Sequence, residues 1–157
     1  MERGARIPQN NSFARDIYRA FTAELGAMTA YVQGAVTLAQ HLPSVTRLFD
    51  EIARVEISHY EQLGQLLLHL GIAPALNVRL RNEAVYLEDH STVAASLLAA
   101  QMIKEKIREE QSAAREYRRL AAIAPSDAIK DMLEAIAAEE EEHAIALDGM
   151  RKRFENS

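Results

Sequence analysis

Residues 44–70 read SVTRLFDEIARVEISHYEQLGQLLLHL, and this stretch decides the fold. Its apolar side chains recur at alternating steps of three and four residues, which is the period of a helix with one buried face. Two polar residues, Glu56 and His59, stand on that same face. Because residues three apart share one side of a helix, we expect the carboxylate and the imidazole to point together into the core. Gly71 follows directly and predicts the end of this helix.

The same Glu-x-x-His pattern recurs near the C-terminus as Glu140 and His143. It lies in a second long stretch with helical periodicity. A further stretch of this kind stands before each of the two stretches that contain the pattern. Alanine-rich composition and few glycines favour helix throughout. The sequence therefore predicts four helices, at about 12–41, 44–70, 92–124 and 126–154.

Prolines, glycines and capping residues set the predicted connections. Asn11 or Ser12 is expected to cap the first helix, and Ser44, after Pro43, the second. Residues 72–90 show no clean periodicity, whereas the other two connections are short. Two short connections and one long one predict an all-α four-helix bundle in which two antiparallel helical hairpins are joined by a long crossover.

Composition limits the setting of this bundle. The 157 residues are 48% apolar, enough for one domain with a sizeable core, predicted at 12–154 after a flexible N-terminal tail at 1–11. The absence of cysteine excludes disulfides, thiolate metal sites and thiol catalysis. A net charge of −5 gives no reason to expect nucleic acid or an anionic membrane as partner. No signal-like or membrane-spanning run is found, so we expect a cytoplasmic protein.

The predicted core stripe of each helix is apolar except near its middle. The first and third helices each carry one glutamate followed by a tyrosine seven residues later, and the second and fourth carry Glu-x-x-His. The first and third stripes are Ile17, Phe21, Glu24, Met28, Tyr31, Ala35 and Leu38, and Val93, Leu97, Ala100, Ile103, Ile107, Glu110, Ala114, Tyr117 and Ala121. The two halves of the chain thus repeat, which suits a site with two equivalent centres.

Charge decides what such a site has to hold. Four carboxylates in a helical core each cost several kcal/mol to desolvate and repel one another. Two divalent cations neutralise them, and six ligands suit two metals if two carboxylates bridge, with open positions left for water, oxygen or peroxide. Oxygen and nitrogen ligands without thiolate favour iron or manganese over structural zinc. The predicted ligands are Glu24, Glu56, His59, Glu110, Glu140 and His143.

Several neighbouring residues leave alternatives open. Tyr31 and Tyr117 either donate hydrogen bonds to the ligand carboxylates or are core aromatics with backbone partners. Glu109 competes with Glu110 as the ligand from the third helix, but it lies on a more polar strip with Lys106. Three further acidic residues are expected to form a solvated face, namely Glu139, Glu141 and Glu142.

The ligand set resembles that of the ferritin-like di-iron carboxylate proteins, and most closely their rubrerythrin and bacterioferritin branches. The resemblance covers residues 12–154. It implies two iron ions per chain, with bridging by Glu56 and Glu140, one centre completed by Glu24 with His59, and the other by Glu110 with His143. It also implies oxidation of iron(II) by oxygen or peroxide, or reduction of peroxide with electrons from a separate donor. Homo-oligomers, with the dimer favoured, are expected because such bundles commonly pair.

Three departures narrow the resemblance. The chain has no cysteine for the rubredoxin domain that rubrerythrins usually add. Ala113 stands where they have a seventh, glutamate ligand, which puts their type of peroxidase activity in doubt. Ile57 stands where bacterioferritins have a haem-binding methionine, so no haem is predicted. An iron-storage or cage-cargo protein, a manganese catalase-like variant and a metal-free structural bundle are the alternative functions.

Overall fold

The computed structural model describes residues 11–74 and 91–156, which form four long helices and no strand. The helices are α1 (Ser12–Leu38), α2 (Pro43–His69), α3 (Thr92–Ala122) and α4 (Asp127–Glu155). The predicted all-α four-helix bundle is confirmed. The first helix ends at Leu38, three residues before the predicted end. The predicted tail, except for Asn11, and the crossover from residue 75 onward lie outside the described residues.

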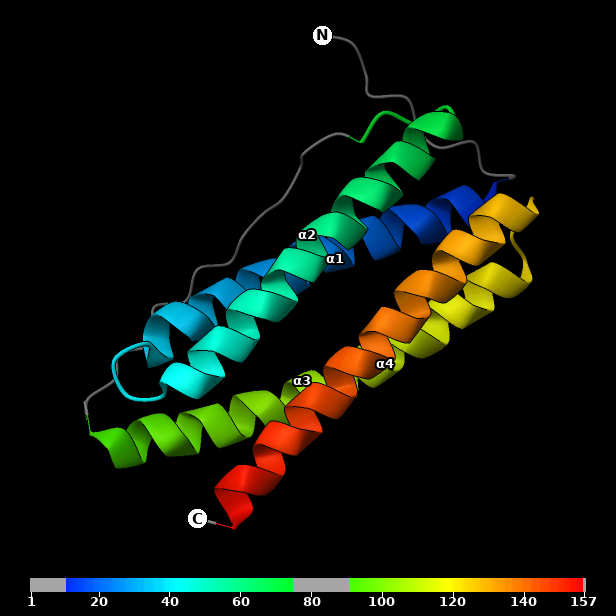
Figure 1. Cartoon of the computed structure of the whole chain (residues 1–157). Coiled ribbons are helices and arrows are strands. Elements are labelled where there is room, and N and C mark those ends of the chain that lie inside the picture. The colour runs from blue at the N-terminus through cyan, green and yellow to red at the C-terminus, as the bar shows by residue number, and fades with distance from the viewer. Residues whose placement is uncertain (1–10, 75–90, 157) are drawn as a thin grey trace, which may run out of the picture.

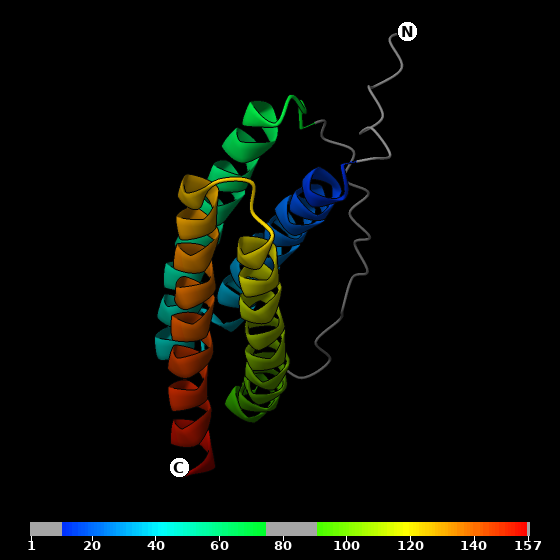
Figure 2. The same ribbon diagram turned by 90° about the vertical axis from the view of Figure 1, so that its right-hand side faces the viewer.

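The bundle consists of two antiparallel hairpins (Figure 1). One is formed by α1 and α2 and the other by α3 and α4, and the helices pack far more closely within each hairpin than between the two. Helices α2 and α3 run in the same direction, so the end of α2 and the start of α3 lie at opposite ends of the bundle (Figures 1 and 2). This arrangement is the one expected for two hairpins joined by a long crossover.

Local sequence explains where the helices begin and end. The Asn11 side chain accepts a hydrogen bond from the Ala14 backbone N–H at 3.0 Å and caps α1. The prediction that Ser44 caps α2 is wrong: the helix begins at Pro43, because proline at the first helical position has a suitable φ and no N–H to satisfy. At the other end of α2, Gly71 has a φ of 79° and completes a glycine-terminated turn.

The buried face of α3 differs from the prediction over its first two turns. Val93 and Leu97 are 71% and 70% exposed, and the small residues Ala95 and Ala99 pack inward instead. The predicted stripe contains two successive steps of three residues, from Leu97 to Ala100 and from Ala100 to Ile103. Because an α-helix repeats every 3.6 residues, two such steps in a row move the predicted stripe away from the buried face. The large apolar side chains were therefore assigned to the wrong face.

The core consists of two apolar clusters with a band of charged side chains between them. One cluster surrounds Phe49 and Leu147, at the end of the bundle where α1 finishes. The other surrounds Leu63 and Leu133, at the end where α4 starts. No helix in the described part of the chain is both long enough and apolar enough to cross a membrane.

Candidate metal centre

The band between the two clusters contains all six predicted ligands, and all six side chains are buried. They form two groups whose candidate ligand atoms lie within 4.8 Å of one another. Glu56 and Glu140 belong to both groups. The groups are Glu24, Glu56, His59 and Glu140, and Glu56, Glu110, Glu140 and His143. Glu56 and Glu140 thus lie between the two groups, and each group adds one further carboxylate and one imidazole. Metal binding by these residues remains a prediction.

Each imidazole faces three carboxylates through its Nδ1 atom. His59 Nδ1 lies 2.9 Å from Glu140 Oε1, 3.4 Å from Glu56 Oε2 and 3.9 Å from Glu24 Oε2. In the other group, three contacts repeat this arrangement, because His143 Nδ1 lies 3.1 Å from Glu56 Oε1, 3.4 Å from Glu110 Oε2 and 3.8 Å from Glu140 Oε2. The two rings are 6.1 Å apart between centroids. The sequence repeat therefore corresponds to a nearly two-fold arrangement of side chains.

Several of these buried atoms make no hydrogen bond despite the short contacts. Both carboxylate oxygens of Glu56, Oε1 of Glu140 and Nδ1 of His59 and His143 lack a hydrogen-bond partner. Buried polar atoms are almost always hydrogen-bonded, because leaving one unpaired costs about 1–3 kcal/mol. Here the unpaired atoms are oxygen and nitrogen lone-pair donors that converge on a common space, which is the arrangement that cations require. The donor set fits two divalent metal ions.

Without metal, the charges in this band are balanced by protons. Burial lowers the pKa of both imidazoles, but the facing carboxylates outweigh it and raise the pKa of His59 to about 11 and that of His143 to about 12. Burial and the neighbouring carboxylates raise the pKa of Glu24 to about 10. Burial also raises the pKa of Glu110, to about 8, although His143 opposes the shift.

The two shared carboxylates behave in the opposite way. Burial favours protonation of Glu56 and Glu140, but contacts with both imidazoles outweigh it and hold the pKa of each carboxyl below its usual value. At neutral pH the metal-free band therefore contains two ionised carboxylates, two protonated carboxyls and two imidazolium ions. These charges cancel.

Two tyrosines connect the hairpins, one on each side of this band. The Tyr31 hydroxyl, on α1, donates a hydrogen bond to Glu110 Oε1 on α3. The Tyr117 hydroxyl, on α3, donates to Glu24 Oε1 on α1. Burial and the adjacent carboxylate raise the pKa of both phenols, so both remain hydrogen-bond donors at neutral pH. Of the two alternatives left open by the sequence, the structure therefore shows hydrogen bonds to candidate ligands, which orient those carboxylates.

Glu139 takes part in the site although it was predicted to lie on a solvated acidic face. Its Oε2 lies 2.6 Å from His59 Nε2, although its side chain is 47% exposed. A carboxylate at Nε2 holds a proton on that nitrogen, so that loss of the other ring proton leaves the Nδ1 lone pair available to a metal ion. Its position directly before Glu140 was the one signal in the sequence. Glu141, on the same predicted face, pairs instead with Arg118.

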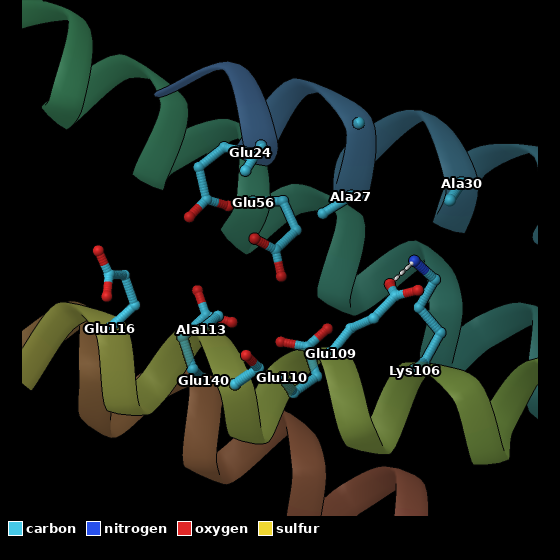
Figure 3. A pocket seen from close by; sticks show the side chains of 13 residues that line it. Glu24, Ala27, Ala30, Glu56, Lys106, Glu109, Glu110, Ala113, Glu116 and Glu140 are labelled. Atoms are coloured by element: carbon cyan, nitrogen blue, oxygen red, sulfur yellow. Dashed lines mark hydrogen bonds and ion pairs between the residues drawn. The ribbon is translucent and has the colours of Figure 1, made fainter. Parts of the chain in front are cut away.

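Helix α3 also places a polar strip beside the site, in a groove against α1 (Figure 3). Glu110 lies inside the carboxylate cluster, whereas Glu109 lies in the groove and pairs with Lys106. Lys106 is only 8% exposed, and its ammonium lies 5.1 Å from the ring centroid of Tyr31. Of the two candidates on the third helix, Glu110 is therefore the one placed to share a cation with His143.

Two antiparallel hairpins with a Glu-x-x-His pair on α2 and on α4, and a buried carboxylate on α1 and on α3, define a ferritin-like bundle with a candidate di-metal site. The family model that matches the chain is that of rubrerythrin, over residues 17–151. The chain therefore belongs to the rubrerythrin family. No curated protein sequence matches it.

Proposed function

We propose that this protein is a di-iron carboxylate oxidoreductase that oxidises iron(II) with oxygen or peroxide, or reduces peroxide, in the cytoplasm. The unpaired buried oxygens of Glu56 and Glu140 carry this proposal. Burying four carboxyl groups in a metal-free core is costly even when protons cancel their charge, whereas two divalent cations satisfy both the charge and the unpaired atoms. Membership of the rubrerythrin family supports iron as the metal.

Each residue has a distinct part in this proposal. Glu56 and Glu140 would bridge the ions, Glu24 with His59 would hold one of them, and Glu110 with His143 would hold the other. Bound iron supplies one electron per ion, which matches the two electrons that reduce one peroxide to two waters. Tyr31 and Tyr117 keep the outer carboxylates in place by their hydrogen bonds.

Repeated turnover also needs a reductant. Reduction of peroxide to water consumes two protons and two electrons, and the site holds only the electrons of its own ions. The proposal therefore includes a separate electron donor. We also propose that the protein assembles as a homodimer.

Metal analysis of protein purified under anaerobic conditions tests the proposal. We expect about two iron ions per chain, and the loss of both in Glu56→Ala or Glu140→Ala because each residue belongs to both groups. Glu142→Ala, at an exposed position of α4, is the matched control and should keep both ions. The reduced protein is then mixed with oxygen or with peroxide, and the faster oxidation identifies the oxidant.

The metal content and the native mass together separate the alternatives. Protein that takes up neither iron nor manganese is a structural bundle, and the proposal is then wrong. Retention of manganese instead of iron indicates the manganese catalase-like variant. A native particle far larger than a dimer, measured by light scattering, indicates a storage or cage-cargo protein.

A further inference from the structure

A groove of about 610 Å³ lies between α1 and α3 and extends from the surface to the buried carboxylates. Its walls near the surface are formed by residues with small side chains or none, which are Ala23, Gly26, Ala27, Ala30 and Ala113. Ala27 on α1 and Ala113 on α3 lie on opposite sides of the opening (Figure 3). Because neither side chain extends beyond Cβ, the space between the helices stays open at the level of the metal centre.

Most of the ionisable side chains along this groove are carboxyls. Six of its lining residues are glutamates and one is a lysine, Lys106, whose ammonium pairs with Glu109. Glu109 and Glu116 are 60% and 47% exposed in their side chains and lie on either side of Ala113 along α3. Seven residues of helix separate the two by about 10 Å, so they cannot hold one ion together. Glu116 pairs with Arg119, as Glu109 pairs with Lys106, and exposed ion pairs of this kind are weak enough to leave both carboxylates on the rim of the opening accessible to a passing cation.

The inner end of the groove points to a ligand independently of these rim charges. Glu56 and Glu140 line it, each is 1% exposed, and three of their four oxygens have no hydrogen-bond partner. A concave path with carboxylates on the rim and unsatisfied carboxylate oxygens at its end attracts cations and repels anions.

We infer that divalent cations reach the metal centre through this groove, attracted by Glu109 and Glu116 and passing between Ala27 and Ala113. This inference rests on the proposed function and adds to it the route by which the ions arrive. Lys106 opposes their passage, because it is the positive charge of the groove and neutralises Glu109.

The charge variants give effects of opposite sign. Metal-free protein is mixed with Co²⁺ in a stopped-flow instrument, and uptake is followed by the visible absorption of the bound ion. At low ionic strength we expect Glu109→Gln and Glu116→Gln each to slow uptake by about two- to tenfold, and Lys106→Gln to accelerate it by a similar factor. These differences should shrink in about 1 M salt, where the screening length is about 3 Å.

Two exposed positions on the same helix provide matched controls. Glu105→Gln and Lys104→Gln change the charge of α3 by the same amounts but lie outside the groove lining. Both should load at the wild-type rate. Equal effects from the groove variants and these controls would mean that only the net charge matters, and the inference would be overturned.

Filling the opening tests the path without a change of charge. Ala27→Leu and Ala113→Leu should slow uptake more than the charge variants do, while the final amount of bound metal stays the same. Ala138→Leu, at an exposed position of α4, is the control for the added side chain. Using both leucine variants guards against one of them folding poorly, which circular dichroism detects.

The outcomes separate this inference from the proposed function. Wild-type protein that binds no Co²⁺ contradicts the metal centre itself. Wild-type protein that binds two ions, with Ala27→Leu and Ala113→Leu loading at the same rate, overturns the groove route alone. If those variants slow the reaction of the iron-loaded protein with peroxide but not its loading, the groove admits the oxidant, and the inference is again wrong.

Discussion

Loading of the metal-free protein with two divalent ions should release about four protons at pH 7. Burial and neighbouring carboxylates raise the pKa of Glu24 to about 10 and that of Glu110 to about 8, so both carboxyls are protonated. Facing carboxylates raise the pKa of His59 to about 11 and that of His143 to about 12, so both imidazoles carry an extra proton. Metal ligands have to be deprotonated. Two carboxyl protons and two imidazolium protons therefore leave as the ions bind.

This exchange preserves the charge of the core, because four protons and two divalent ions each contribute a charge of +4. It also makes metal affinity depend steeply on pH. The product of the two association constants should rise by about 10⁴ per pH unit near pH 7, since each proton released contributes a factor of about ten.

Isothermal titration calorimetry in two buffers of different ionisation enthalpy measures the number of protons directly. The titration is carried out with Mn²⁺ or with anaerobic iron(II), and is repeated at two pH values to obtain the slope. Release of fewer than about two protons, with two ions bound, would refute the protonation pattern derived from the contacts of the six side chains.

Three further predictions concern stability and affinity. Four buried groups of the metal-free protein have a higher pKa in the folded than in the unfolded state, namely Glu24, His59, Glu110 and His143. Their protonation stabilises the fold fully at a pH below the pKa of the unfolded state, and this stabilisation is lost as the pH rises towards the pKa of the folded state. The Tm measured in the presence of a chelator should therefore fall between about pH 6.5 and 9. An unchanged or rising Tm contradicts this sign. Glu139→Ala removes the partner of His59 Nε2 and should weaken binding of the ion beside Glu24 and His59 by about 10–100-fold, which calorimetry detects as a lower affinity of the stronger of the two binding steps, whereas equal weakening of both steps is not expected. Gly34→Ala should destabilise the fold by about 1–3 kcal/mol in urea, because its Cβ would lie 2.8 Å from the buried Phe49 ring. Gly149→Ala meets no atom within 4 Å and should instead stabilise α4 by up to about 1 kcal/mol; similar values for the two glycine variants would contradict the packing argument.

The bundle and its charged band could be predicted because each predicted ligand lies on the buried stripe of its own helix. Glu24, Glu56 and Glu140 are polar residues at positions where the period of three and four requires burial, and a periodic pattern shows such exceptions clearly. The start of α3 could not be predicted in the same way. Its buried positions are Ala95 and Ala99, and alanine is apolar but too small to outweigh the neighbouring Val93 and Leu97 in a pattern based on hydrophobicity.

Contacts between the hairpins were the other part that periodicity could not provide. Glu139 is largely a surface residue by its position on α4, and its contact with His59 depends on how α4 lies against α2, 80 residues away in the sequence. The role of Lys106 was missed for a similar reason, because its burial follows from the position of Tyr31 on α1. Helical periodicity fixes the face of a side chain within its own helix but not its neighbour on the next one.

The sequence repeat predicts two equivalent centres, and the surroundings of the six side chains make them unequal. Glu139 precedes the α4 glutamate and contacts His59, whereas the matching position before the α2 glutamate is Val55, which has no side-chain acceptor. Lys106 lies four residues before Glu110, and the matching position before Glu24 is occupied by the uncharged Ala20. Both differences favour a cation on the His59 side, because the carboxylate of Glu139 lies there, whereas the ammonium of Lys106 lies over the ring of Tyr31, whose hydroxyl contacts Glu110. The two ions should therefore bind one after the other although their ligands match, and the first should bind beside Glu24 and His59. The order is set by the charges of Glu139 and Lys106, which lie outside the two sets of ligands.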